Sequence, residues 1–197
     1  RIFQLANEYH TTVDVIFMSL YQFVLSVLFD KKDMTIGVVV NNRLEEEGGD
    51  KLFGLHLNTI PLRQQMDNKD IDSLIKTTRD NKTKVYEYKS YPYGKLKADL
   101  NLTQDIYQCV FNYMHFHIIQ GQYKNQNITS SGGFEKTNIP LAMHVFRGED
   151  EFSVRFSGSD NFVDTAALKK LKDYLVFYLE QITISNDKTI ALKRIPK

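Results

Sequence analysis

The feature that most constrains the fold is residues 11–29, the most apolar stretch of the chain. Its apolar side chains recur at the three-to-four-residue spacing of a helix, and the opposite side is also mostly apolar. Thr11 or Thr12 can cap the start of such a helix, and Asp14 is favourably placed in its first turn. Because a helix that is apolar nearly all round does not lie on a surface, the sequence predicts a buried helix here.

A membrane span and a signal peptide are the two alternatives for residues 11–29. The run is barely long enough to cross a bilayer, and polar side chains interrupt it. These polar residues are Asp14, Ser19, Gln22 and Ser26. A signal peptide would end in a small-residue cleavage site, and Phe29-Asp30-Lys31-Lys32 is not one. Both alternatives are weaker than the buried helix.

Length and charge limit the class of protein. The 197 residues are enough for one domain or two small lobes with a real core. With 25 basic and 24 acidic residues the formal net charge is +1, which argues against binding to nucleic acid or to a membrane surface. The single cysteine, Cys109, excludes a disulfide framework and suggests a reducing cytoplasm. A helical pattern begins almost directly at Arg1, so we expect a piece cut from a longer polypeptide.

Two stretches predict neighbouring strands of a sheet. Residues 34–41 are apolar on both faces and predict a central strand. Residues 54–63 predict a second strand with a polar notch at Asn58 and Thr59, where a buried Asn must find hydrogen-bond partners. Pro61 has no N–H for a ladder, so it must lie near a strand end or on an unpaired edge.

The remaining elements complete the expected architecture. Residues 106–116 alternate as a strand does, and residues 140–147 and 151–158 predict a hairpin. Amphipathic helices are predicted over residues 67–83 and 164–183. The expected fold is α/β, an α+β two-layer sandwich with a mixed sheet and helices mainly on one face.

Short motifs follow one another in a specific order. Residues 36–43 read Ile-Gly-x-x-Val-x-Asn-Arg, and residues 54–63 read Gly-Leu-x-x-Asn-Thr-x-Pro-Leu-Arg. Tyr91-Pro92, with Lys and Leu at 95–96, comes next, and Phe-Asn-Tyr at 111–113 follows it. In this order the motifs resemble the second half of the condensation domains of nonribosomal peptide synthetases.

The chain departs from the family pattern in two places. At residues 88–90 the sequence Tyr-Lys-Ser stands where the family has His-Gln-Asp. The Arg-Asp-x-Ser-Arg-Asn-Pro-Leu element of the family is not recognisable in residues 99–108. The subtype of domain, and with it the donor substrate, therefore stays open.

The resemblance implies a fold and a set of supporting residues. It implies a half domain of the chloramphenicol-acetyltransferase-like superfamily: residues 1–197 are the C-terminal lobe, and the N-terminal lobe is absent. Residues of about 43–53 would form a floor loop under the reaction tunnel, and about 117–139 a latch to the other lobe. Arg43, next to Asn42, would form an ion pair with the Asp of the His-His-x-x-x-Asp-Gly motif in the first lobe. The polar notch, Asn58 and Thr59, would line the tunnel or tie its strand to the next one.

The resemblance also implies a reaction. Condensation domains join an acyl or peptidyl donor to an aminoacyl acceptor, both held as thioesters on the phosphopantetheine arms of carrier proteins. No cofactor would bind this lobe directly, and the implied partners are the N-terminal lobe, peptidyl carrier domains and an adenylation domain. Two alternatives remain open: a lobe of an acyltransferase of the same superfamily that uses CoA or another free acceptor, and a non-catalytic interaction module.

Histidines supply the other candidates for chemistry. His10 and Asp14 mimic a His-x-x-x-Asp motif, but Tyr9 and Val15 stand where the family has His and Gly. The gap to Arg43 is also too short, so we expect no catalytic residue in this chain and no activity from the chain alone. His115-x-His117 could face a metal from one side of a strand, but no third ligand is evident and we predict no metal site. Single histidines in strands, His56 and His144, are expected to be half-buried with satisfied hydrogen bonds.

Overall fold

The computed structural model describes residues 1–43, 46–67, 70–115, 138–148 and 151–184. Within them the chain forms one five-stranded mixed sheet with the order β2-β1-β3-β4-β5. The central three strands run parallel, and the two edge strands pair antiparallel with their neighbours. The strands are β1 (Asp33–Asn41), β2 (Leu57–Gln65), β3 (Cys109–His115), β4 (Leu141–Arg147) and β5 (Phe152–Gly158). The predicted mixed sheet is confirmed.

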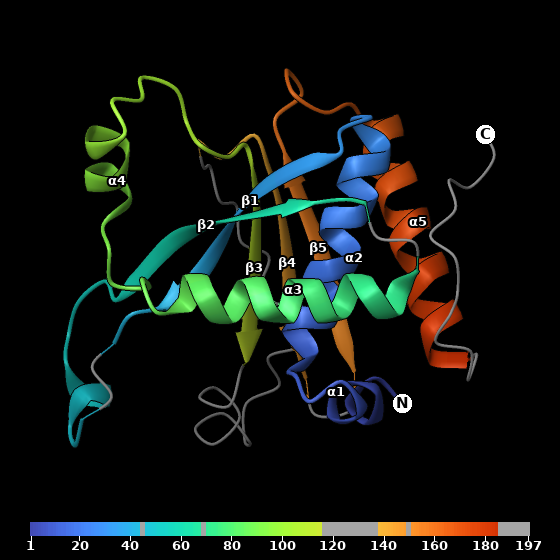
Figure 1. The fold of residues 1–197 in the computed structure, drawn as a ribbon, viewed down its shortest axis with the longest axis horizontal. Helices are drawn as coiled ribbons and strands as arrows, with labels where there is room; N and C mark the ends of the chain where they lie inside the picture. Colours follow the sequence, from blue (N-terminus) through green and yellow to red (C-terminus); the bar gives the residue numbers. More distant parts are fainter. Residues whose placement is uncertain (44–45, 68–69, 116–137, 149–150, 185–197) are drawn as a thin grey trace, which may run out of the picture.

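The long helices cover one face of this sheet. In Figure 1, α3 runs across the front of the strands, α2 crosses it and α5 lies at the right, while α4 stands apart at the upper left. Helix α2 contacts both α3 and α5 and packs on β1, β3 and β4, so it forms the centre of the core. The helices are α1 (Ile2–Glu8), α2 (Val13–Leu28), α3 (Ile71–Tyr86), α4 (Tyr93–Asp99) and α5 (Thr165–Ile184), with a short 3-10 helix, η1 (Gly49–Lys51).

Helix α2 is buried on all sides, as its apolar pattern predicts. The ring of Tyr21 lies 6.4 Å from that of Phe111 on β3, and other α2 side chains pack against α5. Polar residues that argued against a membrane span make hydrogen bonds inside the protein, although Gln22 Oε1 is buried without a partner among the described residues. Ser19 Oγ donates to Val15 O at 2.6 Å, and Gln22 Nε2 donates to Leu62 O at 3.2 Å, which joins the helix to β2.

A membrane span was the alternative interpretation of helix α2. Among the described residues, no single helix is both long and apolar enough to cross a bilayer. Helices α1 and α2 would pass such a test only as a pair, and the chain bends by 93° between them.

Pro61 lies on an edge strand, as predicted. Within the described residues, β2 pairs only with β1, and Pro61 lies opposite Gly37 in that ladder. At the two ends of the ladder, Met66 N donates to Lys32 O at 2.6 Å and Asn42 N donates to His56 O at 2.7 Å. Residues at even positions of β2 therefore bond to β1, and the N–H that Pro61 lacks would point away from the sheet. A proline there also opposes pairing of this edge with another strand.

The bounds of three elements, and one helix, differ from the sequence-based expectations. Helix α3 begins at Ile71 rather than at residue 67, with Asp70 as its cap, and ends at Tyr86 rather than at residue 83. Strand β2 begins at Leu57 rather than at residue 54, because Gly54 adopts φ 145° and the chain before Leu57 is an exposed loop. Strand β3 begins at Cys109 rather than at residue 106. Helix α4 was not predicted, since it has only seven residues and buries none of them, so it lacks the apolar periodicity that marks longer helices.

Candidate functional site

Arg43 holds the start of the expected floor loop. Its backbone N–H donates to Asn41 Oδ1 at 3.0 Å, just beyond the end of β1. Its Nη1 donates to Gly49 O at 3.0 Å and to Leu52 O at 2.6 Å. One guanidinium therefore bonds two carbonyls that lie six and nine residues further along the chain. This closes the loop on itself and fixes the chain that follows it.

The chain after this closure exposes an apolar ridge, which we define as Leu52, Phe53, Leu55 and Leu57. Phe53 is fully exposed and Leu55 is 86% exposed. Large apolar side chains that are exposed close together are unusual on a monomeric protein and are typical of interaction surfaces and ligand grooves. In Figure 1 this loop, with η1, extends from the lower left of the molecule beyond the ends of β1 and β2.

Asn42 and Asn58 bind the same stretch of chain from two neighbouring strands. Ser90 Oγ donates to Asn42 Oδ1 at 2.6 Å. Asn58 Nδ2 donates to Lys89 O at 2.8 Å and to Tyr91 O at 2.9 Å. Asn58 thus ties β2 to the segment after α3 rather than to the next strand, and its tunnel-lining role stays a prediction. The polar notch in β2 is therefore explained by its partners.

Thr59 belongs to a separate cluster on the sheet face opposite α2. Its methyl group and the ring of Tyr107 pack over Gly37, where a β-carbon would lie 2.8 Å from Thr59 Cγ2 and 2.5 Å from Tyr107 Cε2. Thr59 also makes a side-chain hydrogen bond with Tyr107, and burial raises the pKa of Tyr107 to about 12. The glycine of the Ile-Gly motif is thus required for the close approach of a tyrosine ring.

His10 and Asp14 do not form a catalytic pair. His10 is exposed with φ 48°, and Asp14 Oδ2 instead pairs with Lys82 Nζ at 2.6 Å. The side chains of Asp14 and Lys82 are 17% and 21% exposed, so this ion pair is partly buried between α2 and α3. That His10 is not a general base stays a prediction.

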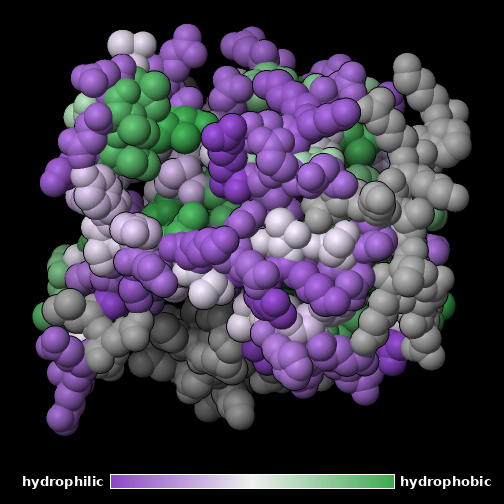
Figure 2. Space-filling view, in the orientation of Figure 1, coloured by the Kyte–Doolittle hydropathy of each residue, from purple (hydrophilic) through white to green (hydrophobic). Residues whose placement is uncertain are grey.

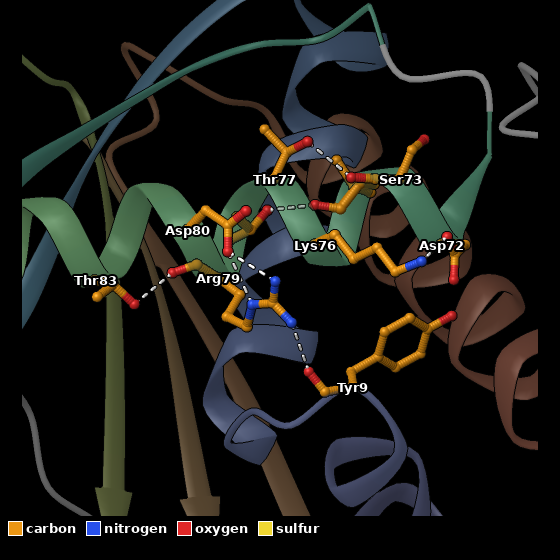
Figure 3. A network of polar contacts seen from close by, with 10 residues as sticks. Tyr9, Asp72, Ser73, Lys76, Thr77, Arg79, Asp80 and Thr83 are labelled. Carbon is orange, nitrogen blue, oxygen red and sulfur yellow. Dashed lines mark hydrogen bonds and ion pairs between the residues drawn. The ribbon is translucent and has the colours of Figure 1, made fainter.

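The turn that carries His10 is bound to α3 by a second contact. Figure 3 shows Arg79 between the turn and the helix: its Nη1 donates to Tyr9 O at 3.0 Å, and its Nε donates to Asp80 Oδ1 at 2.9 Å. The ring of Tyr9 is buried, and its hydroxyl points toward Asp72. Burial, with the Asp72 carboxylate beside it, raises the pKa of Tyr9 well above its usual range. These residues form a structural junction of α1, α2 and α3.

The other histidines give no metal site in the described part of the chain. No group of three His, Cys, Asp or Glu side chains comes together there. His117, like the expected latch at about 117–139, lies outside the described residues. His144 Nε2 is 3.2 Å from Ser157 Oγ, which confirms a satisfied histidine. The same expectation was wrong for His56, whose Nε2 is buried without a hydrogen-bond partner among the residues that the structure describes.

Comparison with known proteins identifies the family of this chain. The family model described as "Condensation domain" matches residues 1–194. The chain belongs to the condensation-domain family. Bacitracin synthase 3 of Bacillus licheniformis is 24% identical over 202 residues, which cover 99% of this chain and 3% of that protein. Gramicidin S synthase 2 of Brevibacillus brevis is 22% identical over 205 residues, 100% of this chain and 4% of that protein. The chain thus spans a small part of these synthetases.

Solved condensation domains have the same fold. The domain of the monacolin K polyketide synthase superposes with a TM-score of 0.74 at 16% identity, over 98% of this chain and 45% of that one. The X-domain from teicoplanin biosynthesis gives a TM-score of 0.81 at 13% identity, over 100% of this chain and 46% of that one. These likenesses confirm the predicted fold, and the chain spans just under half of each structure.

Two residues at the candidate site were missed by sequence reasoning. Ser90 stands where the family has Asp, and the sequence does not indicate that its hydroxyl bonds to Asn42. Tyr107 lies within the predicted strand 106–116, but β3 begins at Cys109, so Tyr107 belongs to the loop before the strand. Gly37 could have indicated the contact with Tyr107, since a glycine inside a central strand indicates the close approach of another group.

Proposed function

We propose that this chain is the second lobe of a condensation domain that forms an amide bond. The donor would be an acyl or peptidyl thioester and the acceptor an aminoacyl thioester, each on the phosphopantetheine arm of a carrier domain. The observation that carries the proposal is the apolar ridge beside Arg43, a surface built for another polypeptide, in a chain that spans just under half of its structural relatives. That other polypeptide would be the N-terminal lobe.

Arg43 would act as a positioning residue between the lobes. A guanidinium has five N–H donors in a planar fork, enough to bond two loop carbonyls and one carboxylate. The carboxylate would be the Asp of the His-His-x-x-x-Asp-Gly motif in the first lobe, which holds the loop of the general base. Arg43 would then couple the floor loop to the catalytic loop, while Asn42, Asn58 and Thr59 keep the strands under the tunnel in place.

The proposal assigns the general base to the first lobe. In the described residues, the Asp14 carboxylate pairs with Lys82 Nζ at 2.6 Å. The proposed partners are the N-terminal lobe, peptidyl carrier domains and a neighbouring adenylation domain. We also propose a cytoplasmic setting, which is supported by the single, buried Cys109.

Amide formation between carrier-bound thioesters tests the proposal. The isolated chain should give no amide above background, and the same chain joined to a first lobe with an intact His motif should give product. Turnover by the isolated chain that disappears in His10→Ala would overturn it. Product from free CoA thioesters, but not from carrier-bound ones, would support the acyltransferase alternative. A folded, two-lobed protein with an intact motif and no transfer activity would support the interaction module.

A further inference from the structure

A serine, a histidine and an asparagine form a row across three neighbouring strands. His144 Nε2 lies 3.2 Å from Ser157 Oγ, and His144 Nδ1 lies 3.5 Å from Asn112 Nδ2. Asn112 is on β3, His144 on β4 and Ser157 on β5, and these strands are adjacent in the sheet. The imidazole of His144 therefore contacts a hydroxyl through one nitrogen and a side-chain amide through the other.

All three side chains lie on the sheet face that points away from the core. Successive side chains of a strand point to opposite faces, and the residues next to the three in their strands face the core, namely Phe111, Met143 and Phe156. Helices α2, α3 and α5 cover the core side, and Figure 2 shows mainly hydrophilic side chains over α3. Each residue of the row is half-buried, so part of its surface is open to a small reagent.

The imidazole is held by residues of the sheet itself. In the ladder between β3 and β4, Asn112 lies directly opposite His144. The ring of Phe146, two residues further along β4, stacks with that of His144 at 6.4 Å between centroids and 26° between planes. Arg155, opposite His144 on β5, places its guanidinium 5.4 Å from the centre of the Phe146 ring. Side chains on paired strands are positioned more precisely than those on loops.

This arrangement is that of an activated nucleophile. A serine hydroxyl is a weak nucleophile until a base within hydrogen-bond reach takes its proton, and a third group must orient that base. An asparagine fills the third place in the Cys-His-Asn proteases. With the Asn112 amide turned so that its Oδ1 faces the imidazole, His144 Nδ1–H donates to it, and Nε2 is left to accept the proton of Ser157.

The acyl donor that suits such a pair is a thioester. A thiol has a pKa of about 8.5, so a thiolate leaves a carbonyl carbon far more readily than an alkoxide or the anion of an amine. One serine with one base therefore suits thioesters better than peptide bonds.

We propose that Ser157 and His144, with Asn112 as positioning residue, form an acyl-transfer site that hydrolyses small acyl thioesters. Ser157 Oγ bonds to the carbonyl carbon, its proton passes to His144 Nε2, and the carbon–sulfur bond breaks so that the thiol leaves with that proton. Water then attacks the ester and gives a proton to Nε2, and Ser157 Oγ recovers this proton as the carboxylic acid departs. The reaction needs neither the first lobe nor amide formation.

Sequence reasoning predicted no catalytic residue in this chain. Asn112 and His144 are 32 residues apart, and His144 and Ser157 are 13 apart, so no local motif joins them. The row forms only when β3, β4 and β5 pair in their register.

Thiol release by the full chain tests the activity. The probe is S-acetyl-N-acetylcysteamine, and Ellman's reagent measures the thiol that is released; the single cysteine of the chain, Cys109, is buried and adds little background. The wild type should release thiol at a saturable rate, Ser157→Ala should lose this activity, and His144→Gln should lower it about a hundredfold. Asn112→Ala should lower it several-fold, and Asn112→Asp should restore it, because a carboxylate also accepts a hydrogen bond from Nδ1–H.

Ser153 provides the matched control. It is exposed on the same face of β5 and lies opposite Phe146, which is not a base, so Ser153→Ala should keep the wild-type rate. A second pair of variants does not depend on turnover. At pH 7, iodoacetamide should alkylate Ser157→Cys about tenfold faster than the more exposed Ser153→Cys, because an imidazole beside a thiol favours the thiolate. Equal thiol release by wild type and Ser157→Ala, or no faster alkylation of Ser157→Cys than of Ser153→Cys, would overturn the proposal.

Discussion

Replacing Asn58 with Ala removes the side chain that joins β2 to the segment after α3. Its Nδ2 donates to two carbonyls, Lys89 O at 2.8 Å and Tyr91 O at 2.9 Å. A typical hydrogen bond contributes about 0.5–1.5 kcal/mol to stability, and a carbonyl left unpaired in a half-buried site adds to the loss. We therefore expect Asn58→Ala to lower the free energy of unfolding by about 2 kcal/mol.

Asn58→Asp tests the same two hydrogen bonds more specifically. It keeps the shape of the side chain but replaces the donor with a carboxylate that faces two carbonyl oxygens. The variant should therefore be less stable than Asn58→Ala at neutral pH. Acid should reduce its deficit, because a protonated carboxyl can again donate to one of the carbonyls.

Urea unfolding followed by circular dichroism measures both changes, with thermal unfolding as a second probe. For a chain of about this length, 2 kcal/mol corresponds to roughly 4–8 °C in Tm. Asn7, exposed on α1, provides the control, since Asn7→Ala and Asn7→Asp should change stability by less than about 0.5 kcal/mol. Wild-type stability of Asn58→Asp would show that these two hydrogen bonds do not hold the segment after α3.

Three further predictions concern packing, pH and activity. Gly37→Ala should destabilise the protein by about 1–3 kcal/mol in urea unfolding, since its β-carbon would displace the ring of Tyr107; wild-type stability would contradict this. Burial raises the pKa of the Cys109 thiol from 9.0 to about 12, so above pH 9 the unfolded chain loses a proton that the folded chain keeps. Stability should therefore fall as pH rises from 9 toward 12, and Cys109→Ala should reduce that slope between pH 9 and 10; an unchanged slope would refute the assignment. The isolated chain should form no amide from carrier-bound thioesters, and product dependent on His10 would refute this.

The parts of the fold that the sequence predicts well are those with one dominant physical cause. Residues 11–29 are apolar on every side, and only burial satisfies such a helix. Pro61 cannot donate to a ladder, and β2 is indeed an edge strand. In both cases one residue type, or one repeat of apolar residues, is enough to predict the element, and the residues that it contacts need not be known.

The parts that sequence reasoning missed depend on contacts between distant residues. Helix α4 buries none of its residues, so no periodic pattern marks it. Arg43 was expected to reach another lobe, and nothing in the sequence indicates that its guanidinium also bonds to Gly49 and Leu52. The role of Ser90 likewise depends on a strand 48 residues earlier in the chain. Such long-range polar contacts have no local signature.

The central claim is that this lobe supports amide formation by holding the catalytic loop of a first lobe through Arg43. The direct measurement is the rate of amide formation by the complete two-lobed domain, together with its melting temperature, for Arg43→Ala and Arg43→Lys. Breaking a buried pair that leaves one charge unpaired costs about 3–5 kcal/mol, so Arg43→Ala should lose both activity and lobe packing. Arg43→Lys keeps the charge without the planar fork and should recover only part of each. Wild-type turnover with a wild-type melting temperature in Arg43→Ala would contradict the account.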